Sequence, residues 1–158
     1  MEEKKYYLTK KGSEKIKKEY DDLKERKLFK VREEAPRILY SEDLNPEYIS
    51  FREDLTFIET RLMELENILK NTVVIKAPSG IAKKEVHLGA TVTLEEKDGS
   101  NNEFMIVGTL EANPGEGKIS SESPVGKALL GNKIGDEVII NSPVTLAYKI
   151  KKVKYEFS

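Results

Sequence analysis

Residues 45–69 read NPEYISFREDLTFIETRLMELENIL, and apolar side chains recur along this stretch at alternating intervals of four and three residues. The recurring positions are Phe51, Leu55, Ile58, Leu62, Leu65 and Leu69. This spacing places them on one face of an α-helix, and its regularity is typical of a coiled-coil seam. Asn45, Pro46 and Glu47 indicate a helix start: a cap, a first helical position and an acid near the positive end of the dipole. The stretch therefore predicts one long helix that needs a partner along its apolar face.

The partner is expected earlier in the same chain. Ile16, Tyr20 and Leu23 follow the same spacing, and Thr9 or Ser13 is placed to cap the helix that carries them. We predict that the two helices fold back on each other as an antiparallel hairpin, each arm about 40 Å long at 1.5 Å per residue. Pairing of the stripe between two copies of the chain is the lesser alternative.

The first helix changes its pattern late in its length. From Leu28 onward the register shifts, and Val31, Ala35 and Ile38 resume the helical spacing after a slip. Pro36 lacks a backbone N–H and removes a helical hydrogen bond. We therefore expect a shifted seam after Leu28 and a kink or break near Ala35 and Pro36.

Three carboxylates lie in or beside the bend between the two predicted helices, within residues 40–50. They are Glu42, Asp43 and Glu47. Such a cluster at the end of a helical rod is either a functional group or a solvated turn. Glu47 has a structural explanation of its own, because an acid two residues after an Asn cap interacts favourably with the helix dipole.

The composition excludes several classes of protein. The chain of 158 residues has a formal net charge of -1, which does not indicate a globally basic nucleic-acid binder. Charged residues make up 35% of it, as a two-helix coil with little core requires. It has no Cys and one His, His87, which excludes disulfides, thiolate catalysis, zinc fingers and multi-His metal sites. No apolar run approaches the length of a membrane span and no signal-peptide core is present, so we expect a cytoplasmic protein with no membrane contact.

The second half of the chain changes to the spacing of strands. Residues 71–86 lose the heptad and form a junction. Strands are predicted at 90–94, 104–107, 138–140 and 147–153, with a turn at 97–100. A short helix is predicted over 124–131, closed by Gly131. We predict an α+β domain in which this helix packs on a twisted, mostly antiparallel sheet.

Four blocks of this half, taken in order, resemble one protein family. They are Leu88-Gly89-Ala90-Thr91-Val92, Ile106-Val107-Gly108, Ile119-Ser120 leading into Ser123-Pro124-Val125-Gly126-Lys127-Ala128-Leu129-Leu130-Gly131, and Gly135-Asp136-Glu137-Val138. Their order and spacing are similar to those of the Gre family of bacterial transcript-cleavage factors. The N-terminal half adds a looser match in Leu8-Thr9-x-x-Gly12, Asp43-Leu44, Asn45, Glu47-Tyr48 and Arg52-Glu53.

The resemblance implies two domains of an α+β protein. Residues 1–75 would form an N-terminal antiparallel coiled coil with an acidic tip, and residues 76–158 a C-terminal FKBP-like domain. In the family the globular domain docks on bacterial RNA polymerase at the rim of its secondary channel. The coil then reaches the active centre, where the nascent RNA 3′ end lies. We expect the protein to act as a monomer.

The resemblance also implies a role for the acidic tip. Hydrolysis of a phosphodiester in a backtracked transcript needs a nucleophilic water and charge neutralisation, which two Mg²⁺ ions supply. A carboxylate delivered from outside can complete the shell of an ion that polymerase holds poorly, since Mg²⁺ uses oxygen ligands. Asp43 and Glu42 are the candidates for this metal-directed role, with Glu47 as a further tip acid. The protein would hold Mg²⁺ only in the polymerase complex, and it would be an accessory factor rather than an enzyme.

The tip departs from the family pattern. The family motif resembles Asp-Leu-x-x-Asn with a second acid directly before the Asn, whereas this chain reads Asp43-Leu44-Asn45, two residues shorter. Asp43 matches the first acid if the gap lies between Leu44 and Asn45. If the gap lies earlier, Leu44 takes the place of the second acid. Glu42 and Glu47 are neighbouring acids that could substitute.

Further residues have both a functional and a structural explanation. Arg37 and Arg52 flank the tip and suit contacts with RNA phosphates, or they are solvated charges of the coil. The family uses the loop before the short helix for polymerase contact, and helix capping explains such residues equally. In this chain the loop residues are Ser120, Ser123, Pro124 and Gly126.

Three functions follow from these observations. The leading hypothesis is an elongation factor that binds polymerase, stimulates transcript cleavage and rescues arrested complexes. The first alternative is a Gre-like factor that binds the same channel and inhibits, because its short tip does not place the second metal productively. The other alternative is an FKBP-like prolyl isomerase or chaperone. Its pocket would be lined by aromatic residues, and few are present in the second half: Phe104, Tyr148, Tyr155 and Phe157.

Overall fold

The computed structural model describes residues 4–36, 45–141 and 144–156. These residues form two compact units. The helical unit comprises residues 13–71, and the sheet unit comprises residues 4–12 and 72–158, each within the described ranges. Among the described helices, none combines the length and the apolar character needed to cross a membrane.

Helix α1, Lys10–Glu33, is the first arm of the hairpin. Of the two predicted caps, Thr9 is the one used: the Gly12 amide donates to Thr9 Oγ1 at 3.1 Å, while Ser13 lies inside the helix. The helix ends at Glu33, shortly before Pro36. The predicted break near Pro36 is therefore confirmed, since proline cannot continue the helical hydrogen bonding.

The predicted shift of the seam late in α1 is wrong. The original spacing continues through Lys27 and Lys30, and the Lys30 side chain is only 12% exposed, with Nζ 5.5 Å from the centroid of the Phe51 ring. Val31, which was predicted to resume the seam, is 48% exposed. Lysine stems can cover apolar surface while their charged ends stay in water, so the helix keeps its register with lysines at seam positions. Ile38, the last residue of the predicted shifted seam, lies outside the described residues.

Helix α2, Pro46–Lys70, is the second arm and begins as predicted. Asn45 Oδ1 accepts a hydrogen bond from the Glu47 amide at 3.0 Å, and Pro46 lies in the first turn. All six residues of the apolar stripe are buried or half-buried, with Ile58 and Leu65 almost completely enclosed. The predicted stripe is therefore confirmed.

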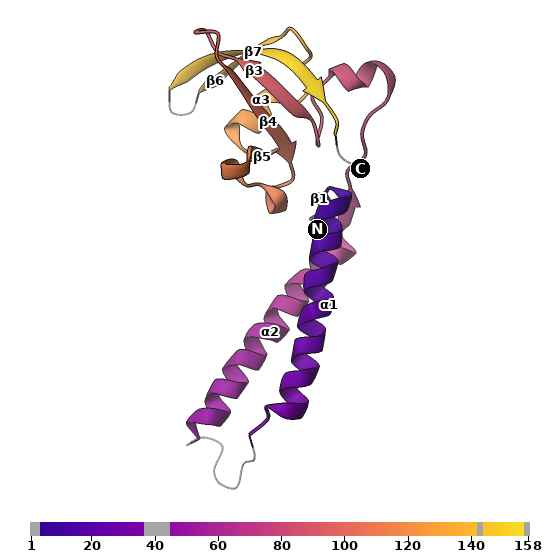
Figure 1. Cartoon of the computed structure of the whole chain (residues 1–158), viewed down its shortest axis with the longest axis vertical. Coiled ribbons are helices and arrows are strands. Elements are labelled where there is room, and N and C mark those ends of the chain that lie inside the picture. The colour runs from indigo at the N-terminus through magenta and orange to yellow at the C-terminus, as the bar shows by residue number, and fades with distance from the viewer. Residues whose placement is uncertain (1–3, 37–44, 142–143, 157–158) are drawn as a thin grey trace. The chain divides into compact units, whose positions relative to one another are not determined.

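Ion pairs show that α1 and α2 run antiparallel. The pairs are Glu19–Arg61, Lys27–Glu59 and Lys30–Asp54. The residue numbers fall along α2 as they rise along α1, and Figure 1 shows the two helices side by side as a hairpin. The stripe of α2 is therefore packed within one chain.

The sheet unit has five strands in one sheet. They are β3 Thr91–Glu95, β4 Asn101–Val107, β5 Lys118–Ser120, β6 Glu137–Asn141 and β7 Thr145–Lys154. Their order is β5-β4-β3-β7-β6, and every neighbouring pair is antiparallel except the parallel pair β4–β5. Helix α3, Pro124–Leu129, lies beside this sheet (Figure 1). Its Leu129 is buried in the core. The predicted α+β fold class is confirmed.

A single apolar core holds this unit together. Its buried members are Val86, Ala90, Val92, Leu94, Ile106, Ile119, Leu129, Val138, Ile140 and Ile150. Three 3₁₀ helices connect the strands: Gly80–Lys84, Thr109–Glu111 and Pro114–Glu116. The core positions alternate with exposed ones along β6, as expected for strands with one buried face.

A parallel pair of short strands was not predicted. Strand β1, Tyr6–Leu8, precedes α1, and strand β2, Thr72–Val74, follows α2. The Ile75 amide donates to the Leu8 carbonyl at 2.8 Å, and Leu8 is buried. Both strands belong to the sheet unit, so the two ends of the helical hairpin enter the same compact unit.

Candidate functional site

The four residues predicted to contact polymerase lie where β5 ends and α3 begins, with Ser120 at the end of β5 and Pro124 and Gly126 in α3. Ser123 Oγ donates to the Ser120 carbonyl at 2.7 Å and accepts from the Gly126 amide at 3.1 Å, which makes Ser123 the N-cap of α3. Pro124 occupies the first turn of that helix and is exposed. The capping explanation of Ser123 and Pro124 is therefore confirmed, and the structure brings all four residues together.

Ser120 belongs to a hydrogen-bonded cluster at the end of β5. Thr109 Oγ1 donates to Glu122 Oε2 at 2.9 Å, because a carboxylate accepts hydrogen bonds. The 3.0 Å contact between Thr109 Oγ1 and Ser120 Oγ is then donated by Ser120, whose hydroxyl also accepts from the Glu122 amide at 3.1 Å. Thr109 and Glu122 were not singled out in the sequence, because neither lies in a local capping pattern.

Gly126 lets α3 approach the backbone of this loop. A Cβ at this position would lie 2.1 Å from the Ser120 carbonyl oxygen and 3.1 Å from the Ser121 Cα. Both of these are backbone atoms, so a side chain here would force the loop or the helix to move. The glycine therefore has a structural role in shaping the loop.

A second cluster anchors the N-terminal strand beside this loop. The Glu111 carboxylate accepts from the Thr9 amide at 2.8 Å and from Thr9 Oγ1 at 2.6 Å. A Cβ at Gly12 would lie 2.1 Å from Glu111 Oε1, and one at Gly108 would lie 2.1 Å from the Tyr7 carbonyl oxygen. Sequence reasoning missed Glu111, because the residues that it contacts lie far away in the chain. The sequence offered one signal for this close packing: Gly12 and Gly108 both lie in segments that match the family.

A small hollow of about 90 Å³ lies where this strand meets the loop. Lys4 and Lys5 of the N-terminal segment and Ser121 and Glu122 of the loop are among the residues that line it. The Lys4 ammonium lies 5.6 Å from the centroid of the Tyr6 ring. The hollow is therefore lined by charges of both signs and by an aromatic ring.

The tip of the hairpin is described only from Asn45 onward. Glu42, Asp43 and Arg37 lie outside the described residues. Glu47 lies in the first turn of α2 with an exposed side chain, which agrees with its interpretation as a dipole-favoured acid. Arg52 is exposed and its guanidinium lies 5.9 Å from the centroid of the Tyr48 ring. This contact is within helix α2, so it places Arg52 near the tip without restricting it to a structural role.

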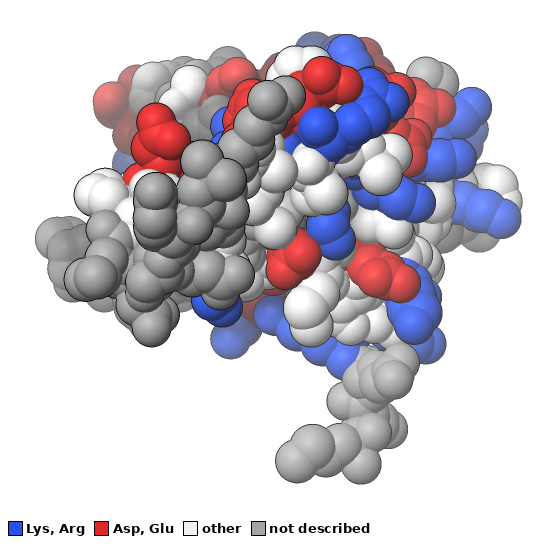
Figure 2. Space-filling view, turned by 90° about the horizontal axis from the view of Figure 1, so that it is seen from below, with Lys and Arg blue, Asp and Glu red and all other residues white. Residues whose placement is uncertain are grey.

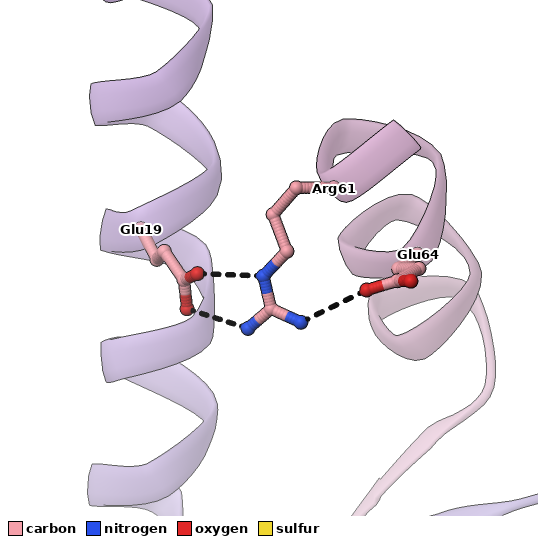
Figure 3. Close-up of polar contacts among 3 residues, drawn as sticks. All are labelled: Glu19, Arg61 and Glu64. Atoms are coloured by element: carbon pink, nitrogen blue, oxygen red, sulfur yellow. Dashed lines mark hydrogen bonds and ion pairs between the residues drawn. The ribbon is translucent and has the colours of Figure 1, made fainter. Parts of the chain in front are cut away.

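Arg61 is the most extensively paired side chain between the two helices (Figure 3). Its Nε and Nη2 atoms donate to the two carboxylate oxygens of Glu19 at 2.8 and 3.1 Å, and Nη1 donates to Glu64 at 3.1 Å. The hydrogen bonds to Glu19, and then those to Glu64, raise the pKa of Arg61. The forked geometry holds α1 and α2 in register on one side of the hairpin.

The aromatic residues of the sheet unit pack against its core. Phe104, Tyr148 and Tyr155 are half-buried there, and Phe157 lies outside the described residues. The Tyr155 hydroxyl donates to the Glu85 carbonyl and accepts from the His87 amide at 2.9 Å, and burial raises the pKa of Tyr155. These residues act as core and as a tie between loops, which disfavours an aromatic-lined isomerase pocket.

The charged surface is mixed. On the face in Figure 2, Lys and Arg side chains of the described residues are interspersed with Asp and Glu. Within the described ranges, no group of three or more His, Cys, Asp or Glu residues is arranged to hold a metal ion. The candidate metal ligands Asp43 and Glu42 lie outside those ranges.

These features define a two-unit α+β protein in which a helical hairpin is combined with a sheet unit that carries a capped surface loop. Residues 6–74 match the family model "Transcription elongation factor, N-terminal", and residues 81–155 match "Transcription elongation factor, GreA/GreB, C-term". The chain belongs to the GreA/GreB family of transcription elongation factors.

Two GreA proteins agree with this assignment. The chain is 41% identical over 157 residues to transcription elongation factor GreA of Clostridium acetobutylicum, covering 97% of this chain and 99% of the relative. It is 40% identical over 144 residues to GreA of Geobacillus kaustophilus, covering 89% and 90%. Among solved structures, GreA factor homolog 1 (Gfh1) of Thermus thermophilus is 26% identical, with coverage of 95% and 99% and a TM-score of 0.42.

Proposed function

We propose that this protein binds bacterial RNA polymerase at its secondary channel, stimulates cleavage of backtracked nascent RNA and so rescues arrested complexes. The observation that carries the proposal is the match of both halves of the chain to the GreA/GreB family models, over residues 6–74 and 81–155. The helical hairpin and the capped loop supply the two parts that such a factor needs. The protein would act in the cytoplasm as a monomer.

The loop between β5 and α3 is the proposed polymerase contact. Ser120 and Ser123 shape the loop through their hydrogen bonds, and Gly126 lets the helix approach it. Pro124 and Glu122 are exposed and would meet the partner directly. Because the loop is ordered by its own hydrogen bonds, binding would cost little conformational entropy.

The hairpin is the proposed means of delivery. Helix α2 has 25 residues, so it spans about 37 Å at 1.5 Å per residue. Asp43 and Glu42 would be carried at its far end, with Glu47 on the first turn of α2. Arg37 and Arg52 would contact phosphates of the nascent RNA near its 3′ end.

The tip acids would work only inside the polymerase complex. Their carboxylate oxygens are the donor type that Mg²⁺ takes, so Asp43 and Glu42 fit the role of added ligands. An ion bound there would neutralise charge on the reacting phosphate. The protein would hold no such ion alone, and it would be an accessory factor that completes a nuclease site belonging to polymerase.

A cleavage assay on stalled elongation complexes tests this proposal. The expected result is Mg²⁺-dependent shortening of the transcript that is faster with the protein than without it. Asp43→Asn should abolish the stimulation, whereas Glu66→Gln, a matched change of an acid far from the tip, should preserve it. Unchanged stimulation by Asp43→Asn would show that the metal-directed acid has been assigned incorrectly.

One observation favours a second candidate function. The tip is two residues shorter than the family pattern, reading Asp43-Leu44-Asn45. A protein with this tip could occupy the channel without placing a second metal. The same assay would then show slowed elongation and no shortening of the transcript.

A further inference from the structure

The helical unit has an open groove along one side of the hairpin. Its volume is about 490 Å³, and Tyr20 of α1 and Leu62 of α2 contribute to its lining. Leu28 and Met63 also line it, one from each helix, and they are 69% and 71% exposed. Large apolar side chains left in water on both walls of one groove are typical of an interaction surface.

The two walls of this groove carry opposite charges. Lys24 and Lys27 lie on the α1 wall, and Glu59 and Glu66 lie on the α2 wall. Lys27 and Glu59 form an ion pair at 3.3 Å, which shows that the two walls are level with each other along the hairpin. The Lys24 ammonium lies 5.3 Å from the centroid of the Tyr20 ring.

Other cross-helix contacts lie away from the groove. Arg61 with Glu19, and Lys30 with Asp54, join the two helices, and none of these residues lines the groove. At 100° per residue, Arg61 and Met63 project to well-separated directions around α2. Of these three cross-helix ion pairs, only Lys27–Glu59 therefore lies in the groove, where the apolar side chains of Leu28 and Met63 remain exposed beside it.

We propose that a second copy of this chain occupies the groove, and that two hairpins associate reversibly into a four-helix bundle. A twofold axis parallel to the hairpins sets α1 of each copy against α2 of the other, so every neighbouring helix is antiparallel. Because the walls are level, this operation sets the lysine wall of one copy against the glutamate wall of the other. A twofold axis perpendicular to the hairpins and parallel to the plane of their facing surfaces would instead set lysines against lysines.

The charge pattern identifies a second copy as the occupant. A single hairpin presents both complementary walls, so the interface satisfies itself without another partner. The bundle would also remove Leu28 and Met63 of both copies from water. The monomer would be the form that acts on polymerase, and the bundle a form favoured at high protein concentration.

Sedimentation equilibrium of the full chain tests this inference. Between about 5 µM and about 500 µM, the range of a weak complex, the mass should rise from 18.0 kDa toward twice that value. Met63→Glu should weaken association at least about tenfold. The control Phe57→Glu changes another exposed apolar residue of α2 that does not line the groove, and it should leave association unchanged.

A charge exchange tests the arrangement of the two copies. Lys24→Glu alone and Glu66→Lys alone should each weaken association, and the double variant should restore it. Circular dichroism should show equal helix content in all variants. A mass of 18.0 kDa at every concentration would overturn the inference, as would equal effects of Met63→Glu and Phe57→Glu, or a double variant no tighter than the single ones.

Discussion

The sheet unit and the helical unit are stabilised in different ways. The sheet unit encloses an apolar core in which Leu94, Ile106, Leu129 and Ile150 are fully buried. In the helical unit, the buried apolar residues of α2 are Ile58, Leu65 and Ile68, while the α1 side of the seam is half-buried and ends in lysines. One unit is stabilised mainly by burial, and the other by a narrow seam with ion pairs along it.

This difference fits the two tasks proposed for the protein. A docking surface needs a fixed shape, and a cooperative core provides it. A rod that enters a channel must remain polar on its outside, and two helices alone cannot enclose much apolar surface. Single substitutions should therefore lower the free energy of unfolding more in the sheet unit than in the hairpin.

The largest effect is expected from a cavity in the sheet unit. Leu94→Ala should lower the free energy of unfolding of this unit by about 2–5 kcal/mol, because the surrounding sheet cannot collapse into the space. Leu65→Ala should cost less, although Leu65 is also fully buried, because two helices can close over the space more easily than a sheet core can. Hydrogen exchange would compare the two variants, measured in β3 for Leu94→Ala and in α2 for Leu65→Ala. An equal or greater loss of protection in α2 would contradict the expected difference between the units. Ile139→Ala, at an exposed position of β6, is the matched control.

A smaller but still clear effect is expected in the loop. Gly126→Ala should cost about 1–3 kcal/mol, because the new Cβ meets the Ser120 backbone rather than a movable side chain. Gly115→Ala is the control, since its Cβ would meet only the Asn113 side chain, at 3.4 Å. Thermal unfolding of both variants measures the difference. Equal melting temperatures of the two variants would contradict tight packing of α3 against the Ser120 backbone.

The Glu111 anchor should come next in size. Glu111→Gln keeps the shape of the side chain but weakens the two hydrogen bonds from Thr9, which a charged acceptor strengthens. The expected loss is about 1 kcal/mol. Hydrogen exchange of the Thr9 amide is the direct measurement, and unchanged protection of that amide would show that the anchor does not depend on the charge.

The smallest effect is expected from the hairpin surface. Arg61→Ala removes the contacts with Glu19 and Glu64, yet Arg61 is partly exposed, so the loss should stay within about 0.2–1 kcal/mol. The loss should shrink as salt is added, because surface ion pairs are screened. Urea denaturation at low and high salt would measure the loss of stability and its dependence on salt. A loss as large as that of Leu94→Ala would remove the contrast between the units.

Much of the fold could be predicted because its signals are local. The stripe of α2, the cap at Asn45 and the strands of the sheet follow from spacing that neighbouring residues set. The seam of α1 was predicted wrongly beyond Leu28, because Lys27 and Lys30 act there through their stems. The β1–β2 pair was missed because two short strands far apart in the chain carry no periodicity of their own.

The candidate site also has features that the sequence predicts and features that it does not. Capping by Ser123 could be predicted from the sequence, whereas the anchor of Thr9 on Glu111 depends on packing between distant segments. The assignment of Asp43 and Glu42 stays a prediction, since both lie outside the described residues. Their role must therefore be tested by function.

The central claim is that the sheet unit binds polymerase while the tip of the hairpin supplies the chemistry. Its most direct test is a competition assay, in which the Asp43→Asn variant is added in excess to arrested complexes together with the unmodified protein. We expect the variant to bind polymerase normally and to suppress transcript cleavage by the unmodified protein in proportion to its excess. Cleavage that continues undiminished at saturating variant would contradict it.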